Sequence, residues 1–525
     1  MSQEILLPVI LGLVFLLVKF VGFSKQTGKP IPGPPALPLI GKSPAIQIPQ
    51  HSQDMGTPIR GDLPTTPWPR AKLDLLKQLQ DCKRSSRKKV SCYIHSPQFR
   101  VGKHGFGWKT DGSYAVWESL ETLRSIIHAS LTPNATNALQ PAQNFEGKQL
   151  IWDIFNSINN SGNTQEAKDD REMGFYTHVQ RYSASVILLM ESNAITQIYK
   201  VMNDFGRVAN PMYAAIGIFP WLLNLPKRMH WWNSDLNRIE ERQSEVRLHY
   251  WNQMKDKIDK EAGYRQKGIG ELQAAYVCGT MIEAGSDTTA TSVNNGLLYL
   301  SAYPDVVAKA HEEIERVVGS SRSPTFEDDL PYTRAIVKET LRIRPATTMG
   351  GPHAADQDIE YNGYIIPKGT GLMLHQNGIQ MDPELYPEPE KFNPDRFLDH
   401  PLKAGDYVGI ADPYRRDRWT YGTGRRICSG MHVAKNSFHI VFAKILWAYT
   451  ISAPRDDEGK LLPVDLSDDA FVLGAVTVAK PYRCMFSPSN PQVAETIARE
   501  WKEAEREGFQ LGDRKVGIDG IIAST

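Results

Sequence analysis

One short segment of this 525-residue chain, residues 419–430 (WTYGTGRRICSG), most restricts how the chain can fold. It sets one cysteine among three glycines: Cys428 with Gly422, Gly424 and Gly430. Glycines permit a tight turn whose backbone N–H groups point at the sulfur, and a thiolate stabilised in this way can bind a metal. A lone cysteine is more often a small buried apolar residue. This combination of residues is expected on the order of once in a million starting positions, so we interpret Cys428 as a metal ligand.

Arg426 indicates which metal group the segment would hold. It lies two residues before the cysteine, where a guanidinium could pair with an acidic group of a flat ligand. The glycines would let such a ligand approach the backbone closely. A haem carries both iron and two propionates, so the segment predicts a haem with Cys428 as its axial ligand.

Composition excludes some classes of protein. The formal net charge is only +1, so bulk attraction to nucleic acid is not expected. The five cysteines show neither paired nor zinc-type spacing, which suits a reducing compartment without disulfides. The length allows one large domain or two to three ordinary ones with ample core.

The amino-terminal residues predict a membrane anchor. Residues 5–23 are almost entirely apolar and would reach about 28 Å as a helix, close to the thickness of a hydrocarbon core. We expect an uncleaved transmembrane anchor at residues 1–24, because no small-x-small cleavage site follows; a cleaved signal peptide is the alternative. Lys19, Lys25 and Lys29 on its carboxyl side predict that the rest of the chain lies in the cytosol.

Two segments follow the anchor. Residues 25–42 are rich in proline, which fixes φ and removes donors, so a stiff extended hinge is expected. Residues 43–118 combine frequent Pro, Gly and Ser with no helical or strand period. They are either a divergent region or wrongly translated sequence, and the second case would put activity in doubt.

A long apolar helix is predicted at residues 275–300, with a polar insertion at residues 283–289 (EAGSDTT). Gly weakens a helix and Thr competes for its backbone hydrogen bonds, so this insertion is locally unfavourable. Residues that are unfavourable for the local structure suggest function, although a Thr-rich contact between packed helices is the alternative. Further on, Glu339 and Arg342 share one face of a predicted helix; taken alone, such a pair is usually a solvated surface pair.

These motifs together resemble the cytochrome P450 family. The cysteine segment is similar to the family's pattern F-x-x-G-x-R-x-C-x-G, with Tyr421 at the Phe position and Ser429 in place of the common proline. Residues 283–289 contain a match to the A-G-x-D-T-T motif. Glu339 and Arg342, with the later segment FNPDRF at residues 392–397, look like the family's E-x-x-R and P-x-R-F motifs. The likeness covers roughly residues 120–486.

The resemblance implies a mainly α fold with small β-sheets. The haem (iron protoporphyrin IX) would lie between a long distal helix and the proximal cysteine loop. Ala284 and Gly285 would leave room for O₂ on the distal face, while Asp287 and Thr288 would relay protons to it.

It also implies roles for residues outside these two elements. Glu339, Arg342 and Arg396 would form a buried charge network that holds the cysteine loop. Arg124 and His353 stand where the family places residues that bind propionates. An exposed helix arginine and a structural histidine are the respective alternatives.

By this resemblance, residues 119–488 form the catalytic core, followed by an amphipathic helix and tail at 489–525. The chain would be a single-pass endoplasmic reticulum protein in contact with membrane lipid, a monooxygenase that oxidises a small hydrophobic substrate with O₂. The family's fungal members suggest specialised metabolism. Electrons would come from NADPH through a separate cytochrome P450 reductase, because the chain carries no flavin or dinucleotide fingerprint.

Two other functions stay open at this point. The divergent residues 43–118 could have removed the substrate site and left a non-catalytic haem protein. A haem-thiolate isomerase or dehydratase that needs no reductase is the other alternative. The intact pair Asp287 and Thr288 argues against the isomerase or dehydratase.

Overall fold

The computed structural model describes much of the chain from residue 124 onward and two short strands before it. The described residues are 29–30, 94–95, 124–125, 127–128, 131–159, 165–188, 225–226, 230, 233–255, 271–348, 350, 353–355, 357–361, 364–368, 370–372, 374–400, 406, 419–456, 458–472, 476–511, 514–517 and 520–524. The expected anchor at residues 1–24 lies outside them. Within the described part of the chain, no helix combines the length and the apolar character needed to span a bilayer.

The chain divides into two compact units. One comprises Met1–Pro97 and Gly351–Leu374, and the other, which we call the helical unit, comprises Gln98–Gly350 and His375–Thr525. The first unit holds two small sheets. In one, β5 (Tyr364–Ile366) lies between β1 (Lys29–Pro30), parallel to it, and β4 (Ile359–Tyr361), antiparallel to it. In the other, β3 (His353–Ala355) pairs antiparallel with β2 (Ile94–His95) and β6 (Gly371–Leu372).

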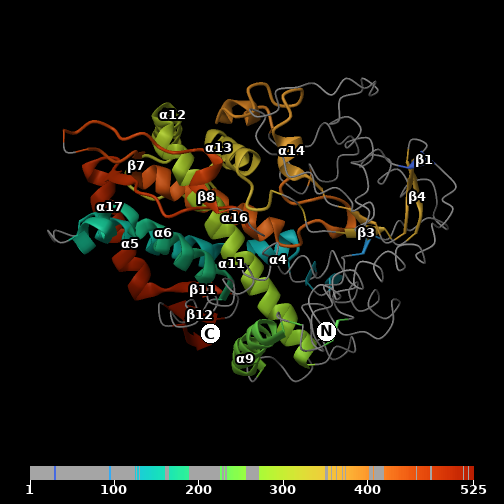
Figure 1. The fold of residues 1–525 in the computed structure, drawn as a ribbon. Coiled ribbons are helices and arrows are strands. Elements are labelled where there is room, and N and C mark those ends of the chain that lie inside the picture. Colours follow the sequence, from blue (N-terminus) through green and yellow to red (C-terminus); the bar gives the residue numbers. More distant parts are fainter. Residues whose placement is uncertain are drawn as a thin grey trace, which may run out of the picture. The chain divides into compact units, whose positions relative to one another are not determined.

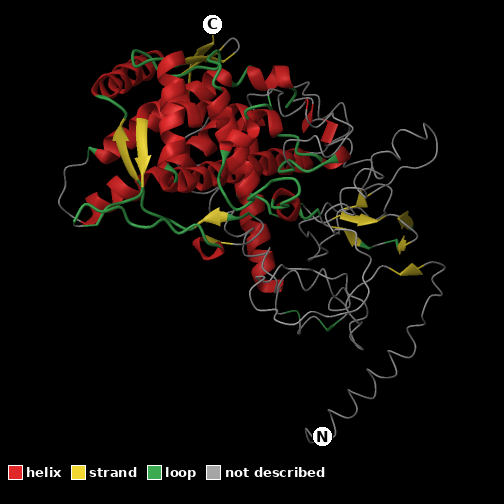
Figure 2. Ribbon diagram, turned by 90° about the horizontal axis from the view of Figure 1, so that it is seen from above, coloured by secondary structure: helices red, strands yellow, loops and turns green. Residues whose placement is uncertain are grey.

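The helical unit agrees with the expected class, mainly α with short strands (Figure 2). Its helices are α4 (Pro133–Asn137), α5 (Gln140–Ile158), α6 (Gln165–Leu188), α9 (Asn233–Lys255), α11 (Glu271–Ala302), α12 (Pro304–Val317), α13 (Pro331–Ile343), α14 (Gln376–Gln380), α16 (Met431–Ala448) and α17 (Pro491–Glu507), with 3-10 turns η3 (Pro394–Phe397), η5 (Gly424–Arg426) and η6 (Asp468–Ala470). Its antiparallel strands are β7 (Tyr449–Ser452) with β10 (Met485–Pro488), β8 (Phe471–Val472) with β9 (Val478–Ala479), and β11 (Phe509–Leu511), β12 (Arg514–Gly517) and β13 (Gly520–Ser524).

Helix α11 is the central element of the helical unit (Figure 1). Residues 289–301 are all buried, polar as well as apolar ones, so this part of the helix is covered by protein on every side. The turns before them are different, because Thr280 and Ala284 are exposed. The helix therefore combines a firmly packed half with a half that is open along one face.

Local sequence signals fix where the helices begin. Proline occupies the first position of α12, α13 and α17, where its fixed φ suits a helix and its missing N–H costs nothing. The first N–H groups of α13 are capped from another helix: Glu313 of α12 accepts from Tyr332 N at 2.7 Å and Thr333 N at 2.9 Å. Asn490 caps α17 by accepting from Val493 N at 2.9 Å.

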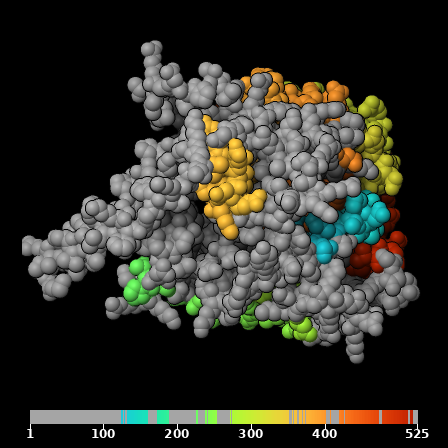
Figure 3. Space-filling view, turned by 90° about the vertical axis from the view of Figure 1, so that its right-hand side faces the viewer, coloured from blue at the N-terminus to red at the C-terminus, as the bar shows by residue number. Residues whose placement is uncertain are grey.

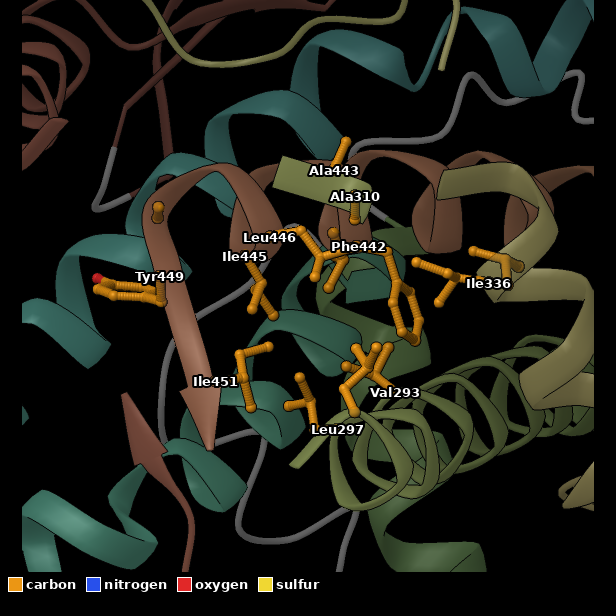
Figure 4. Packing of buried hydrophobic residues seen from close by; sticks show 14 of the residues in the cluster. Val293, Leu297, Ala310, Ile336, Phe442, Ala443, Ile445, Leu446, Tyr449 and Ile451 are labelled. Carbon is orange, nitrogen blue, oxygen red and sulfur yellow. The ribbon is translucent and has the colours of Figure 1, made fainter. Parts of the chain in front are cut away.

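The core of the helical unit lies where α16 packs against α11, α12 and α13. In the close view, Phe442 of α16 points toward Val293 of α11, with Ile336 of α13 to one side (Figure 4). Gly296 permits this close approach, because a Cβ at that position would lie 2.5 Å from Phe442 Cζ. The helix that opens directly after the cysteine loop is thereby packed against the long helix α11.

The carboxyl-terminal segment of the helical unit packs on α5. Trp501 of α17 lies against Phe145 of α5, with ring centroids 5.7 Å apart, and Phe145 also contacts Phe509 of β11 at 5.1 Å. Val493 and Ile497 on the same face of α17 are buried. In the space-filling view the blue-green surface of α4 and α5 borders the red surface of this segment (Figure 3).

Gly296→Ala should destabilise the protein even though alanine is the better helix former. The new methyl group would overlap the buried Phe442 ring and lie 3.0 Å from Thr340 Cγ2, so we expect a loss of about 1–3 kcal/mol. Urea unfolding measures this loss. Gly371→Ala is the control, because a Cβ there has nothing within 4 Å; equal stability of the two variants would contradict the packing described for α11 and α16.

Candidate active site

The cysteine loop is a tight turn that two glycines make possible. Gly422 and Gly424 have φ of +73° and +69°, in the left-handed region that strains other residues. Gly422 N donates to Trp419 O at 2.8 Å, and Cys428 N donates to Tyr421 O at 2.9 Å. The loop therefore folds back on itself and delivers Cys428 just before α16 begins.

The sulfur of Cys428 is positioned to receive a ligand. The residue is exposed, yet desolvation by surrounding protein raises the pKa of its thiol. The residue is thus accessible to solvent, although nearby protein atoms desolvate its thiol. The Gly430 N–H and the charge of Arg124 act in the opposite direction and favour the thiolate. The amino end of α16 adds a partial positive charge on the same side.

Two arginines lie beside the cysteine. Arg124, in a helical stretch far away in sequence, donates from Nη2 to Ile427 O at 2.9 Å, so it is half-buried against the loop and is not a free surface arginine. Desolvation lowers the pKa of Arg426, and the nearby charge of Arg124 lowers it further. Holding two like charges together is unfavourable unless an anion joins them. The two propionates of a haem would meet this requirement, so the residues present fit the cofactor.

The polar insertion of α11 presents a defined face. Ala284 is exposed, and Thr288 Oγ1 donates to Ala284 O at 2.6 Å, which turns the threonine back along this exposed side. Gly285 has a packing role that sequence analysis did not anticipate. A Cβ there would lie 2.8 Å from Ile187 Cδ1, so the absence of a side chain lets α6 approach closely, and room for O₂ at Gly285 stays a prediction.

Asp287 interacts electrostatically with Tyr176 of α6. Its charge contributes, after desolvation, to raising the pKa of Tyr176 to about 12, which places the two groups near each other. Desolvation also raises the pKa of Asp287 itself to about 6. A carboxyl group that titrates near neutral pH can both hold and release a proton under physiological conditions.

The predicted three-residue charge network is assembled in the structure. Arg342 Nε and Nη2 donate to the two oxygens of Glu339 at 2.7 and 2.8 Å, and both side chains are fully buried. Arg396 Nε lies 3.5 Å from Glu339 Oε1. Asn393 N also donates to this oxygen, at 2.8 Å. The network therefore ties α13 to the segment around η3.

Two glutamines that sequence analysis missed connect this network to the cysteine loop. Gln380 Nε2 donates to Arg342 O at 3.0 Å, while its Oε1 accepts from Trp419 N at 3.0 Å and Thr420 Oγ1 at 3.1 Å. Gln376 Nε2 donates to Trp419 O at 2.9 Å. Both glutamines are buried, and their spacing of four on the short helix α14 aims both at the start of the loop.

His353 belongs to β3 in the first unit. Its expected role at a propionate stays a prediction. The structure thus groups Cys428, Arg124 and Arg426 at the loop, and Glu339, Arg342 and Arg396 behind it.

Comparison with known proteins agrees with this architecture. A sequence model of the cytochrome P450 family matches residues 118–473, so the chain belongs to this family. Cytochrome P450 monooxygenase pgmC of Aspergillus terreus is 32% identical over 98% of this chain and 96% of its own length. Cytochrome P450 monooxygenase verL of Clonostachys rogersoniana is 34% identical over 74% of this chain and 73% of its own.

A solved zebrafish cytochrome P450 structure with progesterone is similar in fold. It aligns with a TM-score of 0.54 at 19% identity and covers 71% of this chain and 82% of that chain. The family resemblance inferred from the motifs is therefore confirmed. The protein is a monooxygenase, an oxidoreductase that uses a haem held by a cysteine thiolate.

Gln380→Leu should loosen the cysteine loop. It removes the acceptor of one buried donor, the Trp419 N–H, at a cost of about 1–3 kcal/mol. We expect the purified variant to lose haem faster, which absorbance after transfer to excess apomyoglobin measures. Gln140→Leu is the matched control, because that amide makes one exposed bond to Asn137 at 3.3 Å. Equal haem loss in both variants would contradict this connection.

Proposed function

We propose that Cys428 is the axial ligand of the haem iron and that this protein oxidises a small hydrophobic molecule with O₂. The observation that carries the proposal is the exposed thiol that protein atoms surround, beside two arginines. The Gly430 N–H and the amino end of α16 favour the thiolate form of the sulfur and so oppose the desolvation that raises its pKa. The bound haem supplies O₂ activation and oxygen transfer, which thiolate coordination favours.

Arg124 and Arg426 would hold the haem propionates. Both lie beside the cysteine, and each is half-buried, so an ion pair with a carboxylate there is screened less than at an open surface. His353 is proposed as a third propionate partner from its place in the sequence. These residues orient the ring, while the buried charge network and the two glutamines hold the loop in position.

Asp287 and Thr288 would deliver protons on the other face of the haem. The Thr288 hydroxyl, bonded to Ala284 O, stands at the exposed side of α11. Asp287, with its pKa near 6, supplies an acid one residue away. Reduction of O₂ with cleavage of its O–O bond consumes two protons, and a hydroxyl next to a titratable acid provides a route for them. Ala284 leaves space for O₂ at this face.

The partners follow from the class of enzyme and from the sequence. Electrons would come from NADPH through a cytochrome P450 reductase, because the sequence carries no dinucleotide motif of its own. Residues 1–24 would anchor the protein in the endoplasmic reticulum membrane, with the catalytic unit in the cytosol. The curated relatives are fungal monooxygenases, which supports specialised metabolism as the setting.

Replacing Cys428 tests the assignment. Cys428→Ser should abolish the spectrum typical of a thiolate-bound ferrous–carbon monoxide complex, because serine does not supply the thiolate. Cys278→Ser, at a half-buried position on α11, is the control and should keep it. An unchanged spectrum in Cys428→Ser would overturn the assignment. Wild-type protein that shows the spectrum yet never consumes NADPH with reductase would point to a non-catalytic haem protein.

Asp287→Asn should change both proton delivery and the pH dependence of stability. The pKa of Asp287 is raised from 3.8 to about 6, so the stability linked to its protonation is complete below pH 3.8 and lost as pH rises through about 6. Asparagine removes this dependence, and the variant should gain as much as about 3 kcal/mol relative to wild type at pH 8. Urea unfolding from pH 4 to 8 measures it.

The same variant should also release more hydrogen peroxide per NADPH with reductase, because the acid that supplies protons for O–O cleavage is gone. Glu503→Gln, exposed on α17, is the control for both measurements. A peroxide yield equal to that of the control would argue against a role for Asp287 in proton delivery.

A further inference from the structure

A buried ion pair joins α9 to α11 directly before the proposed oxygen-binding turn. Arg247 Nη2 donates to Glu283 Oε1 and Oε2, both at 2.8 Å, and Nε donates to Oε1 at 3.0 Å. The side chains are only 6% and 17% exposed. Nothing in the mechanism above uses either residue.

The arginine is seated in a slot on α11. A Cβ at Gly279 would lie 2.6 Å from Arg247 Cγ, so only glycine admits the side chain along the helix. The guanidinium lies 4.5 Å from the centroid of the Tyr276 ring, a favourable cation–π distance. The Tyr276 hydroxyl is 2.7 Å from Ser244 Oγ of α9. Residues 276, 279 and 283 follow helical spacing and form one face.

Burying this ion pair has a desolvation cost that an apolar contact between the same two helices would avoid. Desolvation raises the pKa of Glu283, and Arg247 opposes that rise. The neighbouring cluster of Trp251, Ala274, Ala275 and Val277 is apolar, and well-packed apolar residues usually stabilise such a contact at least as well as an ion pair. A contribution to stability therefore does not explain the pair, and its position on α11 points to another role.

Glu283 directly precedes the exposed Ala284 and lies one helical turn before Asp287. Without Arg247, the Glu283 carboxylate would be an unpaired charge next to the face of α11 that carries Thr288. With Arg247 present, the carboxylate is held toward α9, so Asp287 acts on the Thr288 side without a second nearby acid.

We propose that the Arg247–Glu283 pair is a positioning element for the oxygen-side turn of α11. It fixes α9 against the turn before Ala284 and keeps the Glu283 carboxylate directed away from the Ala284–Thr288 face. This inference rests on the proposed function, because it assumes that this face borders the haem.

Carbon monoxide is a suitable probe, because it binds haem iron opposite the thiolate and its stretching frequency responds to nearby charge. In the ferrous–carbon monoxide holoenzyme, Arg247→Met should shift or split the C–O stretching band in the infrared. The double variant Arg247→Met/Glu283→Leu, which removes the stranded carboxylate, should return the band toward the wild-type position. If Arg247→Met does not fold, Arg247→Lys, which keeps the charge but loses the bidentate geometry, should show a smaller shift.

Arg181→Met is the matched control. Arg181 also bridges two helices, from α6 to Glu146 and Asp153 of α5 at 2.7 and 2.9 Å. Its loss should lower thermal stability and leave the C–O band unchanged. A band unmoved in Arg247→Met and Arg247→Lys, or moved equally in Arg181→Met, would overturn the proposal. Failure of the proposed function appears separately, as absence of the thiolate-type absorption spectrum in every variant.

Discussion

The bidentate pair between Glu339 and Arg342 is the interaction on which the candidate site depends. Two fully buried charges are tolerable only when every remaining hydrogen-bonding group has a partner. Arg342 meets this condition by donating to the carbonyl oxygens of Gln380 at 2.9 Å and Pro389 at 2.8 Å. Its guanidinium also lies 5.2 Å from the ring centroid of Tyr386. The segment after α14 therefore has to wrap around the pair before the charges are satisfied.

Neutral side chains connect the buried charge pair to the cysteine loop. Gln380 uses both ends of its amide, one on the backbone at the end of α13 and the other on Trp419 and Thr420. The single Thr420 hydroxyl hydrogen has a second and nearer acceptor in Leu341 O, at 2.8 Å. The start of the loop is thus set by the same helix that carries the charge pair, and its end is set by α16. Because the cysteine loop is fixed at both ends, it can hold the sulfur of Cys428 in one orientation without help from the residues proposed to deliver protons.

The parts of the site that sequence predicted are those where a residue breaks a local rule. Cys428 within a glycine frame, and Gly, Asp and Thr inside a buried helix, are locally unfavourable and so visible in one sequence. Gln376 and Gln380 were missed because a glutamine in a short helix has the same pattern whether it faces solvent or a buried loop. The packing role of Gly285 was missed for a related reason: the neighbour that a Cβ there would meet, Ile187, lies on α6.

The fold shows the same division. Long helices were predictable because periodicity and proline signals are local, as in α11 and α17. Within residues 43–118 no strand was recognised, yet β2 pairs there with β3, more than two hundred residues later in the chain. A strand of two residues carries no period of its own, and its partner cannot be identified from nearby sequence. Register of this kind is a property of the assembled sheet.

Helix α11 shows how two carboxylates on one helix can have different tasks. Glu283 and Asp287 are one turn apart, and desolvation raises the pKa of both. Glu283 meets a guanidinium from α9, which restores its charge, whereas Asp287 lies near the phenol of Tyr176, which offers no positive charge. The first carboxylate is thereby fixed in an ion pair, and the second is left able to take up and release a proton. The neighbouring helices, and not the carboxylates themselves, determine this difference.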